Sequence, residues 1–260
     1  MNNPLDFTGR VVLVTGGSRG IGRGIAEAFL AAGADVAVCG RKEPDELPIA
    51  GNKRAIFVNA DVRDAGQVEN MINEVVERLG RLDVLVNNAG GAPFAEAATA
   101  SPRFSEKVIQ LNLTAALHCA QQANRVMQGQ ESGGSIINIA SVSGVRPSPG
   151  TAAYGAAKAG LVNLTGTLAI EWAPKVRLNS ISAGLIRTEQ AHLHYGNEEG
   201  IARVEETVPL KRLGTPEDIA GACMYFASPL ASYVSGANLV LHGGGETPAF
   251  LTAATVNRGE

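Results

Sequence analysis

A tyrosine and a lysine four residues apart, Tyr154 and Lys158, are the side chains of this sequence best suited to moving a proton. They lie in a stretch with helical spacing, which would place both on one face of a helix. Ser141 precedes Tyr154 by thirteen residues, and Asn112 interrupts a separate apolar stretch. A buried amide without partners costs about 1–3 kcal/mol, so Asn112 also calls for a role.

The chemistry that fits these groups is proton exchange with an alcohol or a ketone. Reducing a ketone requires a hydride on carbon and a proton on oxygen, and a free phenol has a pKa of about 10. An ammonium about 4 Å away stabilises a phenolate by about 4 kcal/mol at an effective dielectric constant of 20, which lowers the phenol pKa. Tyr154 is therefore predicted to be a general acid/base, with Ser141 bonding the substrate oxygen. The alternative is a purely structural Tyr/Lys pair.

A glycine-rich turn near the N-terminus, Gly16-x-x-x-Gly20-x-Gly22, predicts a pyrophosphate site. It follows an apolar strand and opens a helix, whose free amides and positive dipole end would face the anion. The same glycines are compatible with a structural tight turn, but their position between a first strand and a first helix favours a bound dinucleotide.

Apolar strands alternate with helices along the chain. The expected strands span residues 11–15, 35–39, 55–59, 82–86, 135–140, 176–182 and 238–241, and the expected helices span 21–32, 64–79, 104–127, 151–172 and 216–227. Strands that are apolar throughout are covered on both faces, and strand–helix alternation gives right-handed βαβ units with a parallel sheet. We predict a single α/β domain over residues 1–260: a doubly wound, Rossmann-type parallel sheet in three α/β/α layers.

Ligands of such a sheet gather at the carboxyl ends of its strands, where Ser141 and the glycine turn are both expected. Residues 185–213 are the least regular stretch, so we predict a lid over the substrate there. His192 and His194 lie in this stretch, but no third ligand is evident, so no metal is expected.

Composition excludes several other functions. The net charge is −3 with no basic block, which argues against nucleic-acid binding. No apolar run approaches the ~18 residues of a membrane span, and residues 1–10 lack the apolar core of a signal peptide. The three cysteines are far apart, so we expect reduced thiols and a cytoplasmic location.

The motifs together resemble the short-chain dehydrogenase/reductase family. The glycine turn, Asn88-Ala89-Gly90 after the fourth strand, Ser141, and the Tyr154/Lys158 pair occur in the family's order, and the match runs from about residue 7 to residue 245. Within the family, the sequence is most similar to 3-oxoacyl-carrier-protein reductases. The resemblance implies an oxidoreductase that transfers a hydride between a nicotinamide dinucleotide and a ketone or secondary alcohol.

The resemblance also assigns residues to the cofactor. Lys158 would hold the nicotinamide ribose, Asp61 and Val62 would contact the adenine, and Asn112 would hold a water linking Lys158 to solvent. The full set of implied dinucleotide contacts is Gly16, Ser18, Arg19, Gly20, Ile21, Gly22, Arg41, Asp61, Val62, Asn88, Ala89, Gly90, Tyr154, Lys158, Gly184, Ile186 and Thr188. Ala183 replaces a proline usual in the family, which predicts a looser loop beside the nicotinamide.

The choice of nicotinamide cofactor depends on the residues after the second strand. A carboxylate there binds the ribose hydroxyls of NAD, whereas arginine accommodates the 2′-phosphate of NADP. This chain has Gly40-Arg41-Lys42, and by resemblance Arg19 lies near the same ribose. Several cations around one phosphate favour NADP(H) over NAD(H). A merely solvated loop is the alternative for Arg41 and Lys42.

The substrate is not specified by the sequence, because its expected contacts lie in loops at 91–100, 145–150 and 185–213. A small carbonyl or alcohol compound is expected, with a 3-oxoacyl thioester as the first candidate. Recognition of an acyl carrier would use a basic patch, for which Arg103, Lys107 and Arg146 are the candidates. The alternatives are a hydroxysteroid dehydrogenase or broad carbonyl reductase and, in another class, a non-catalytic cofactor sensor. Relatives pair the helices at 104–127 and 151–172 and the region 235–245, which predicts a homotetramer.

Overall fold

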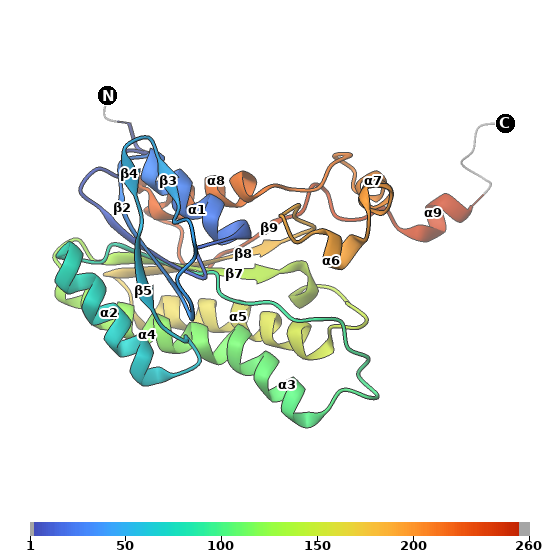
Figure 1. Ribbon diagram of the computed structural model, residues 1–260, viewed down its shortest axis with the longest axis horizontal. Coiled ribbons are helices and arrows are strands. Elements are labelled where there is room, and N and C mark those ends of the chain that lie inside the picture. Colours follow the sequence, from blue (N-terminus) through green and yellow to red (C-terminus); the bar gives the residue numbers. More distant parts are fainter. Residues whose placement is uncertain (1–2, 255–260) are drawn as a thin grey trace.

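The computed structural model describes residues 3–254, and a seven-stranded parallel sheet runs through its centre (Figure 1). The predicted domain ends, residues 1–2 and 255–260, lie outside the described residues. The sheet consists of β1 (Val11–Thr15), β2 (Asp35–Gly40), β5 (Ile56–Asn59), β6 (Val84–Asn87), β7 (Gly134–Ser141), β8 (Val176–Ala183) and β9 (Asn238–Leu241). Its order, β5-β2-β1-β6-β7-β8-β9, grows outward from β1 in both directions. This order confirms the predicted doubly wound fold.

Helices cover both faces of the sheet (Figure 1). One face carries α1 (Gly20–Ala31) and α8 (Pro216–Ala227), and the other carries α2 (Ala65–Leu79), α4 (Ala115–Gly129) and α5 (Ala152–Glu171). The remaining helices are α3 (Pro102–Ile109), α6 (His192–Tyr195), α7 (Glu198–Thr207) and α9 (Ala249–Ala253). The predicted α/β/α layering is therefore present.

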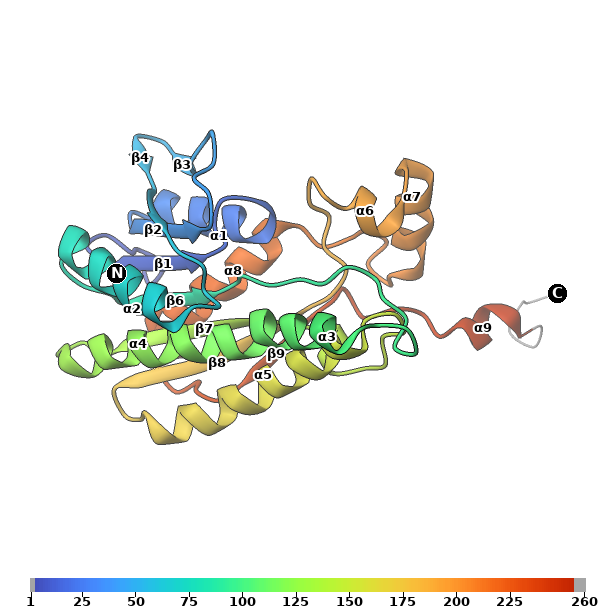
Figure 2. The same cartoon turned by 60° about the horizontal axis from the view of Figure 1, so that its bottom comes forward.

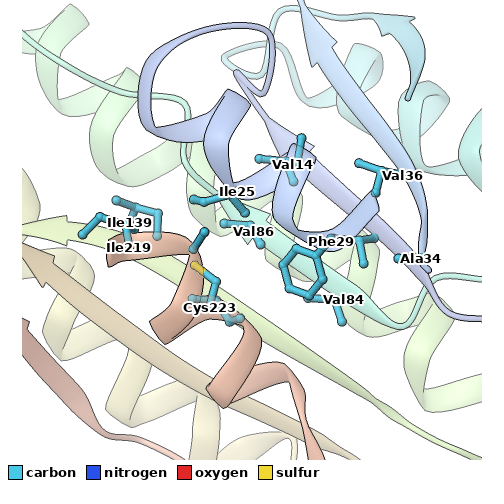
Figure 3. Packing of buried hydrophobic residues seen from close by; sticks show 14 of the residues in the cluster. Val14, Ile25, Phe29, Ala34, Val36, Val84, Val86, Ile139, Ile219 and Cys223 are labelled. Atoms are coloured by element: carbon cyan, nitrogen blue, oxygen red, sulfur yellow. The ribbon is translucent and has the colours of Figure 1, made fainter. Parts of the chain in front are cut away.

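The strand sequences explain the two cores. Alternate residues of β1 face opposite sides: Val12 and Val14 pack with α1 and α8, whereas Val11 and Leu13 pack with α2 and α4. Phe29 of α1 is fully buried over the strands, and Figure 3 shows its ring among the apolar side chains of the first core, labelled as Val14, Ile25, Val36, Val84, Val86, Ile139, Ile219 and Cys223. Strands covered on both faces lose their polar alternation, as the sequence predicted.

Strand register aligns the carboxyl ends that carry the motifs. Thr15 pairs with Cys39 across β1 and β2, and Ser141 pairs with Ala183 across β7 and β8. The Thr15 hydroxyl also accepts hydrogen bonds of 3.0 Å from the amides of Asn88 and Ala89, which ties the end of β6 to the glycine turn. The parallel arrangement thus gathers the predicted motifs at one edge.

Three local features differ from the sequence expectation. A short hairpin of β3 (Ile49–Ala50) and β4 (Lys53–Arg54) follows β2, and the helix expected at 104–127 is divided into α3 and α4 by a π-helical turn, Gln110–Thr114. The stretch 185–213, expected to be irregular, contains α6 and α7. Asn197 caps α7 by accepting a 3.0 Å hydrogen bond from the Gly200 amide, and Ile201 packs on Ala191 and Leu213. One apolar contact per turn is too weak a periodicity to recognise in the sequence.

Figure 2 shows α6 and α7 together at the end of the molecule toward which the parallel strands point. They stand beyond the carboxyl edge where the motifs gather. Within residues 3–254, no helix combines the length and the hydrophobicity needed to cross a lipid bilayer.

Candidate active site

The carboxyl edge of the sheet opens into a cavity of about 640 Å³, a size typical of ligand sites. Every residue predicted to serve catalysis or cofactor binding lines it, with the exception of Asn112: Gly16, Ser18, Arg19, Gly20, Ile21, Gly22, Arg41, Asp61, Val62, Asn88, Ala89, Gly90, Ser141, Tyr154, Lys158, Gly184, Ile186 and Thr188. The fold therefore brings these residues together, while their chemical roles stay predictions.

The glycine turn is packed so closely that side chains are excluded. A Cβ atom on Gly22 would lie 2.4 Å from Nδ2 of Asn88 and 2.5 Å from the carbonyl oxygen of Gly16. The same Nδ2 atom donates hydrogen bonds to the carbonyls of Thr15 and Gly16, at 2.9 and 3.2 Å. Gly16 and Gly20 also have positive φ angles, of 62° and 53°. Because glycine has no side chain, the backbone of the turn is accessible from the cavity at these positions.

The N-terminus of α1 is in contact with a carboxylate from a distant part of the same chain. The amide of Gly20 donates a 2.9 Å hydrogen bond to Oε1 of Glu189, while the Arg19 side chain makes no cap. A carboxylate at this point shows that the turn accepts negative charge, as expected from free amides at the positive end of a helix. The residues of the turn therefore fit a pyrophosphate. Glu189 was not predicted as a site residue.

Cations surround the part of the cavity beyond β2. Arg19, Arg41 and Lys42 line it with exposed side chains, and none of the three forms an ion pair with any residue of the described chain. Asp61, in contrast, accepts a 2.9 Å hydrogen bond from Nε of Arg63, which holds the pKa of that carboxyl below its usual range. Arg63 is a second lining residue that the sequence analysis missed. This region is suited to binding an anionic group on the adenosine part of a dinucleotide.

The candidate proton-transfer groups lie where β7 meets α5. Ser141 ends β7, Tyr154 lies in the first turn of α5, and Lys158 follows one turn later. The Lys158 side chain is only 4% exposed; its Nζ atom donates a 2.8 Å hydrogen bond to the carbonyl oxygen of Ile139 and lies 5.6 Å from the centroid of the Tyr154 ring. The predicted helical juxtaposition of Tyr154 and Lys158 is thus present.

Burial dominates the ionisation of this pair. It raises the pKa of Tyr154, and hydrogen bonding with Ser141 opposes the rise without reversing it. Burial also lowers the pKa of Lys158 to about 8. Loss of water disfavours the charged form of both groups, and for the protein alone it outweighs any lowering of the tyrosine pKa. The effect of the Lys158 charge on the tyrosine pKa stays a prediction. Tyr154 is a protonated phenol at neutral pH.

Asn112 lies behind the cavity in the π-helical turn. Its Nδ2 atom donates to the carbonyls of Val108 and Gly91, at 2.9 and 3.0 Å, and its Oδ1 atom accepts a 2.8 Å bond from the Gly91 amide. A Cβ atom on Gly90 would lie 2.7 Å from this Oδ1 and 3.2 Å from Nζ of Lys158. The side chain thus holds the backbone beside Lys158. Its link to a water stays a prediction.

The stretch at 185–213 contributes further lining residues, namely Glu189, Gln190, His194 and Tyr195. Burial raises the pKa of Tyr195, and the charges of Glu246 and Tyr154 act in the same direction. Tyr195 and Tyr154 line the same cavity. His194 lines the cavity, whereas His192 lines a separate depression beside α7. Residues 3–254 contain no group of three or more His, Cys, Asp or Glu side chains placed to hold a metal ion.

A glycine turn on a doubly wound sheet, with Ser, Tyr and Lys at its carboxyl edge, defines a dinucleotide-dependent oxidoreductase acting on alcohol or ketone groups. Residues 16–246 match the family described as enoyl-(acyl carrier protein) reductase. The chain belongs to the short-chain dehydrogenase/reductase family, as the sequence resemblance predicted.

Curated relatives and solved structures extend this similarity over almost the entire chain. A 3-oxoacyl-[acyl-carrier-protein] reductase of Synechocystis sp. is 37% identical, covering 92% of this chain and 97% of the relative. A 3alpha-hydroxysteroid dehydrogenase of Mediterraneibacter gnavus is 34% identical, covering 90% and 96%. The structure of Thermoplasma acidophilum aldohexose dehydrogenase in ligand-free form superposes with a TM-score of 0.85 at 29% identity, covering 98% of both chains.

Proposed function

We propose that this protein is a cytoplasmic, NADP(H)-dependent reductase of ketones, or dehydrogenase of the corresponding secondary alcohols, with Tyr154 as the general acid/base. The observation that carries the proposal is the meeting of Ser141, Tyr154 and Lys158 at one wall of the cavity that begins at the glycine turn. A structural Tyr/Lys pair would not need a serine hydroxyl, a bare glycine turn and unpaired cations around the same space.

The side chains divide the work of the reaction. Bound NADP(H) would supply or accept the hydride, held by the glycine turn, Lys158 and the segment of Gly184, Ile186 and Thr188. The protonated phenol of Tyr154 gives its proton to the substrate oxygen, and Ser141 hydrogen-bonds the same oxygen as negative charge develops. The nearby Lys158 ammonium stabilises the phenolate that remains. Asn112 keeps the backbone at Gly90 and Gly91 in place beside it.

The preference for NADP(H) is supported by free positive charge. Arg19, Arg41 and Lys42 line the cavity without ion-pair partners in the described chain. Guanidinium groups bind phosphate through paired, charge-assisted hydrogen bonds, and the two residues directly after β2 are Arg41 and Lys42 instead of a carboxylate that would take the ribose hydroxyls of NAD.

A 3-oxoacyl thioester is the first substrate candidate, favoured by the similarity to a Synechocystis reductase that bears this name. Arg146 is paired with Glu246, which leaves Arg103 and Lys107 as the basic residues for an acyl carrier. A hydroxysteroid is the second candidate, favoured by the Mediterraneibacter relative. In both cases residues 185–213 would act as the lid, with His194 and Tyr195 facing the substrate.

Association into a homotetramer is part of the same proposal. β9 is an edge strand whose Leu239 and Val240 are 39% and 38% exposed, and Tyr233 before it is fully exposed. An exposed apolar edge needs a cover, and a second copy of the chain supplies one. Sedimentation of the purified protein should give the mass of four chains; a monomer would overturn this part.

The deciding experiment is a panel of 3-oxoacyl thioesters, ketosteroids and small ketones, followed by nicotinamide absorbance with NADPH and NADH. Turnover of at least one ketone class is expected, with a catalytic efficiency about tenfold or more higher for NADPH. Equal or better use of NADH contradicts the cofactor assignment. Tight dinucleotide binding without turnover on any substrate would indicate the cofactor sensor instead.

A further inference from the structure

The contact between Glu189 and the glycine turn joins two segments that are 169 residues apart in sequence. Oε1 of Glu189 accepts the Gly20 amide at 2.9 Å, and a Cβ atom on Gly20 would lie 3.6 Å from Cγ2 of Thr188. The end of the β8 segment is therefore folded onto the first turn of α1. The carboxylate lies where a pyrophosphate would be expected.

Glu189 differs from its neighbour Arg187 in how it is held. Arg187 pairs with two carboxylates of α7, at 2.7 Å from Glu198 and 3.7 Å from Glu205. Glu189 has no cation within ion-pair distance among residues 3–254, and its carboxylate is held by the hydrogen bond from the Gly20 amide. Arg187 thus holds the segment against α7, and Glu189 holds it against the glycine turn.

Two anions cannot share this amide. A dinucleotide bound as in the proposed function would bring its pyrophosphate to the same N-terminus, where both the hydrogen bond and the helix dipole are already used. We propose that Glu189 is an affinity-determining residue of the cofactor site, whose carboxylate and the dinucleotide pyrophosphate displace one another at the Gly20 amide. This inference rests on the proposed function.

The displacement has a structural consequence for the substrate side. The hydroxyl of Thr188 accepts the Gln190 amide at 3.3 Å and its carbonyl accepts the Ala191 amide at 3.0 Å, so the turn beside Glu189 runs directly into α6. His194 and Tyr195 on α6 line the cavity. Release of Glu189 would therefore loosen the wall that is proposed to contact the substrate.

The test is calorimetric titration of the purified protein with NADPH and with adenosine 2′-monophosphate, which lacks the pyrophosphate. Glu189→Gln and Glu189→Ala are compared with Glu198→Gln, which removes the same charge from the same stretch without touching Gly20. Glu189→Ala, which frees the Gly20 amide, should bind NADPH about tenfold more tightly, and Glu189→Gln, whose side-chain oxygen can still accept this amide, should gain less. Their affinity for adenosine 2′-monophosphate, and both affinities of the Glu198→Gln protein, should stay within about twofold of the original protein.

Three results would overturn the inference. NADPH affinity that is unchanged or weaker in the Glu189 variants excludes the displacement. An equal gain for both ligands, or for Glu198→Gln, indicates a general charge effect. An original protein that binds neither NADPH nor NADH refutes the proposed function itself, and this outcome is distinct from the first two. As a second readout, NADPH but not adenosine 2′-monophosphate should increase backbone hydrogen exchange over residues 188–195 in the original protein.

Discussion

The ammonium of Lys158 lies 5.6 Å from the centroid of the Tyr154 ring and donates its hydrogen bond to the carbonyl oxygen of Ile139. One turn of α5 thus brings a partly buried phenol and a buried amine together. Burial keeps the phenol protonated and lowers the pKa of the amine to about 8. Tyr154 accordingly carries its proton near neutral pH, and the charge of Lys158 becomes sensitive to mildly alkaline conditions.

Replacing Tyr154 with phenylalanine removes the proposed proton donor while leaving the ring that packs beside Lys158. Turnover should fall by about 10²–10⁴-fold, whereas NADPH affinity and thermal stability should change little. Tyr233→Phe is the matched control, because Tyr233 is fully exposed and does not line the cavity. Steady-state kinetics of both variants check the assignment, and retained activity in Tyr154→Phe refutes it.

Lys158 should give the protein a characteristic dependence of stability on pH. Its folded pKa of about 8 lies below its ordinary value of 10.5, so between these values the unfolded chain binds the proton more tightly. Stability therefore rises as pH increases through this window, by an amount on the order of 3 kcal/mol for the cofactor-free protein, and is lowest below about pH 8.

Urea unfolding of the original protein and of Lys158→Met, between about pH 7 and pH 10, isolates this contribution as a difference. The original protein should gain stability relative to Lys158→Met as the pH rises. Lys175→Met controls for a solvent-exposed lysine. Parallel stability profiles for the original protein and Lys158→Met would show that the buried amine keeps its ordinary pKa.

Arg41 should decide between the two nicotinamide cofactors. Arg41→Ala removes a guanidinium that has no carboxylate partner in the described chain, so KM for NADPH should rise about 10- to 100-fold while KM for NADH changes little. Arg54→Ala, in the β3–β4 hairpin, is the control with the same loss of charge. An equal rise in KM for NADPH and KM for NADH would show that Arg41 does not bind the 2′-phosphate of NADPH.

Gly90 allows Asn112 and Lys158 to approach the same backbone. In Gly90→Ala the new methyl would meet Oδ1 of Asn112 at 2.7 Å and Nζ of Lys158 at 3.2 Å. Crowding of this kind costs about 1–3 kcal/mol, and displacement of Lys158 should lower kcat more than it raises KM. Gly129→Ala is the control, since nothing lies within 4 Å of a Cβ there. Unaltered kcat in Gly90→Ala would show that the Lys158 position is not critical.

The sheet and most of the cavity were predictable because local sequence dictates them. Strands such as Val11–Thr15 are apolar on both faces, and the carboxyl ends of parallel strands necessarily converge. The residues that were missed approach through tertiary contacts, as Glu189 does at Gly20. The π-helical turn at Asn112 has no periodic signal. The net direction of the tyrosine pKa could not be predicted, because a pairwise charge argument does not give the size of the burial cost for Tyr154 and Lys158.

The residues that line the cavity are spread along the chain from Gly16 to Tyr195. They lie at the ends of strands that are adjacent in the sheet but are connected by long crossovers. A nascent chain cannot assemble this surface until β8 and the segment after it have left the ribosome, and pairing of such distant strands is intrinsically slow. A dinucleotide that binds here stabilises only the completed sheet, by an amount set by its concentration relative to Kd. The cellular concentration of the nicotinamide dinucleotide would thereby influence the fraction of this protein that escapes degradation.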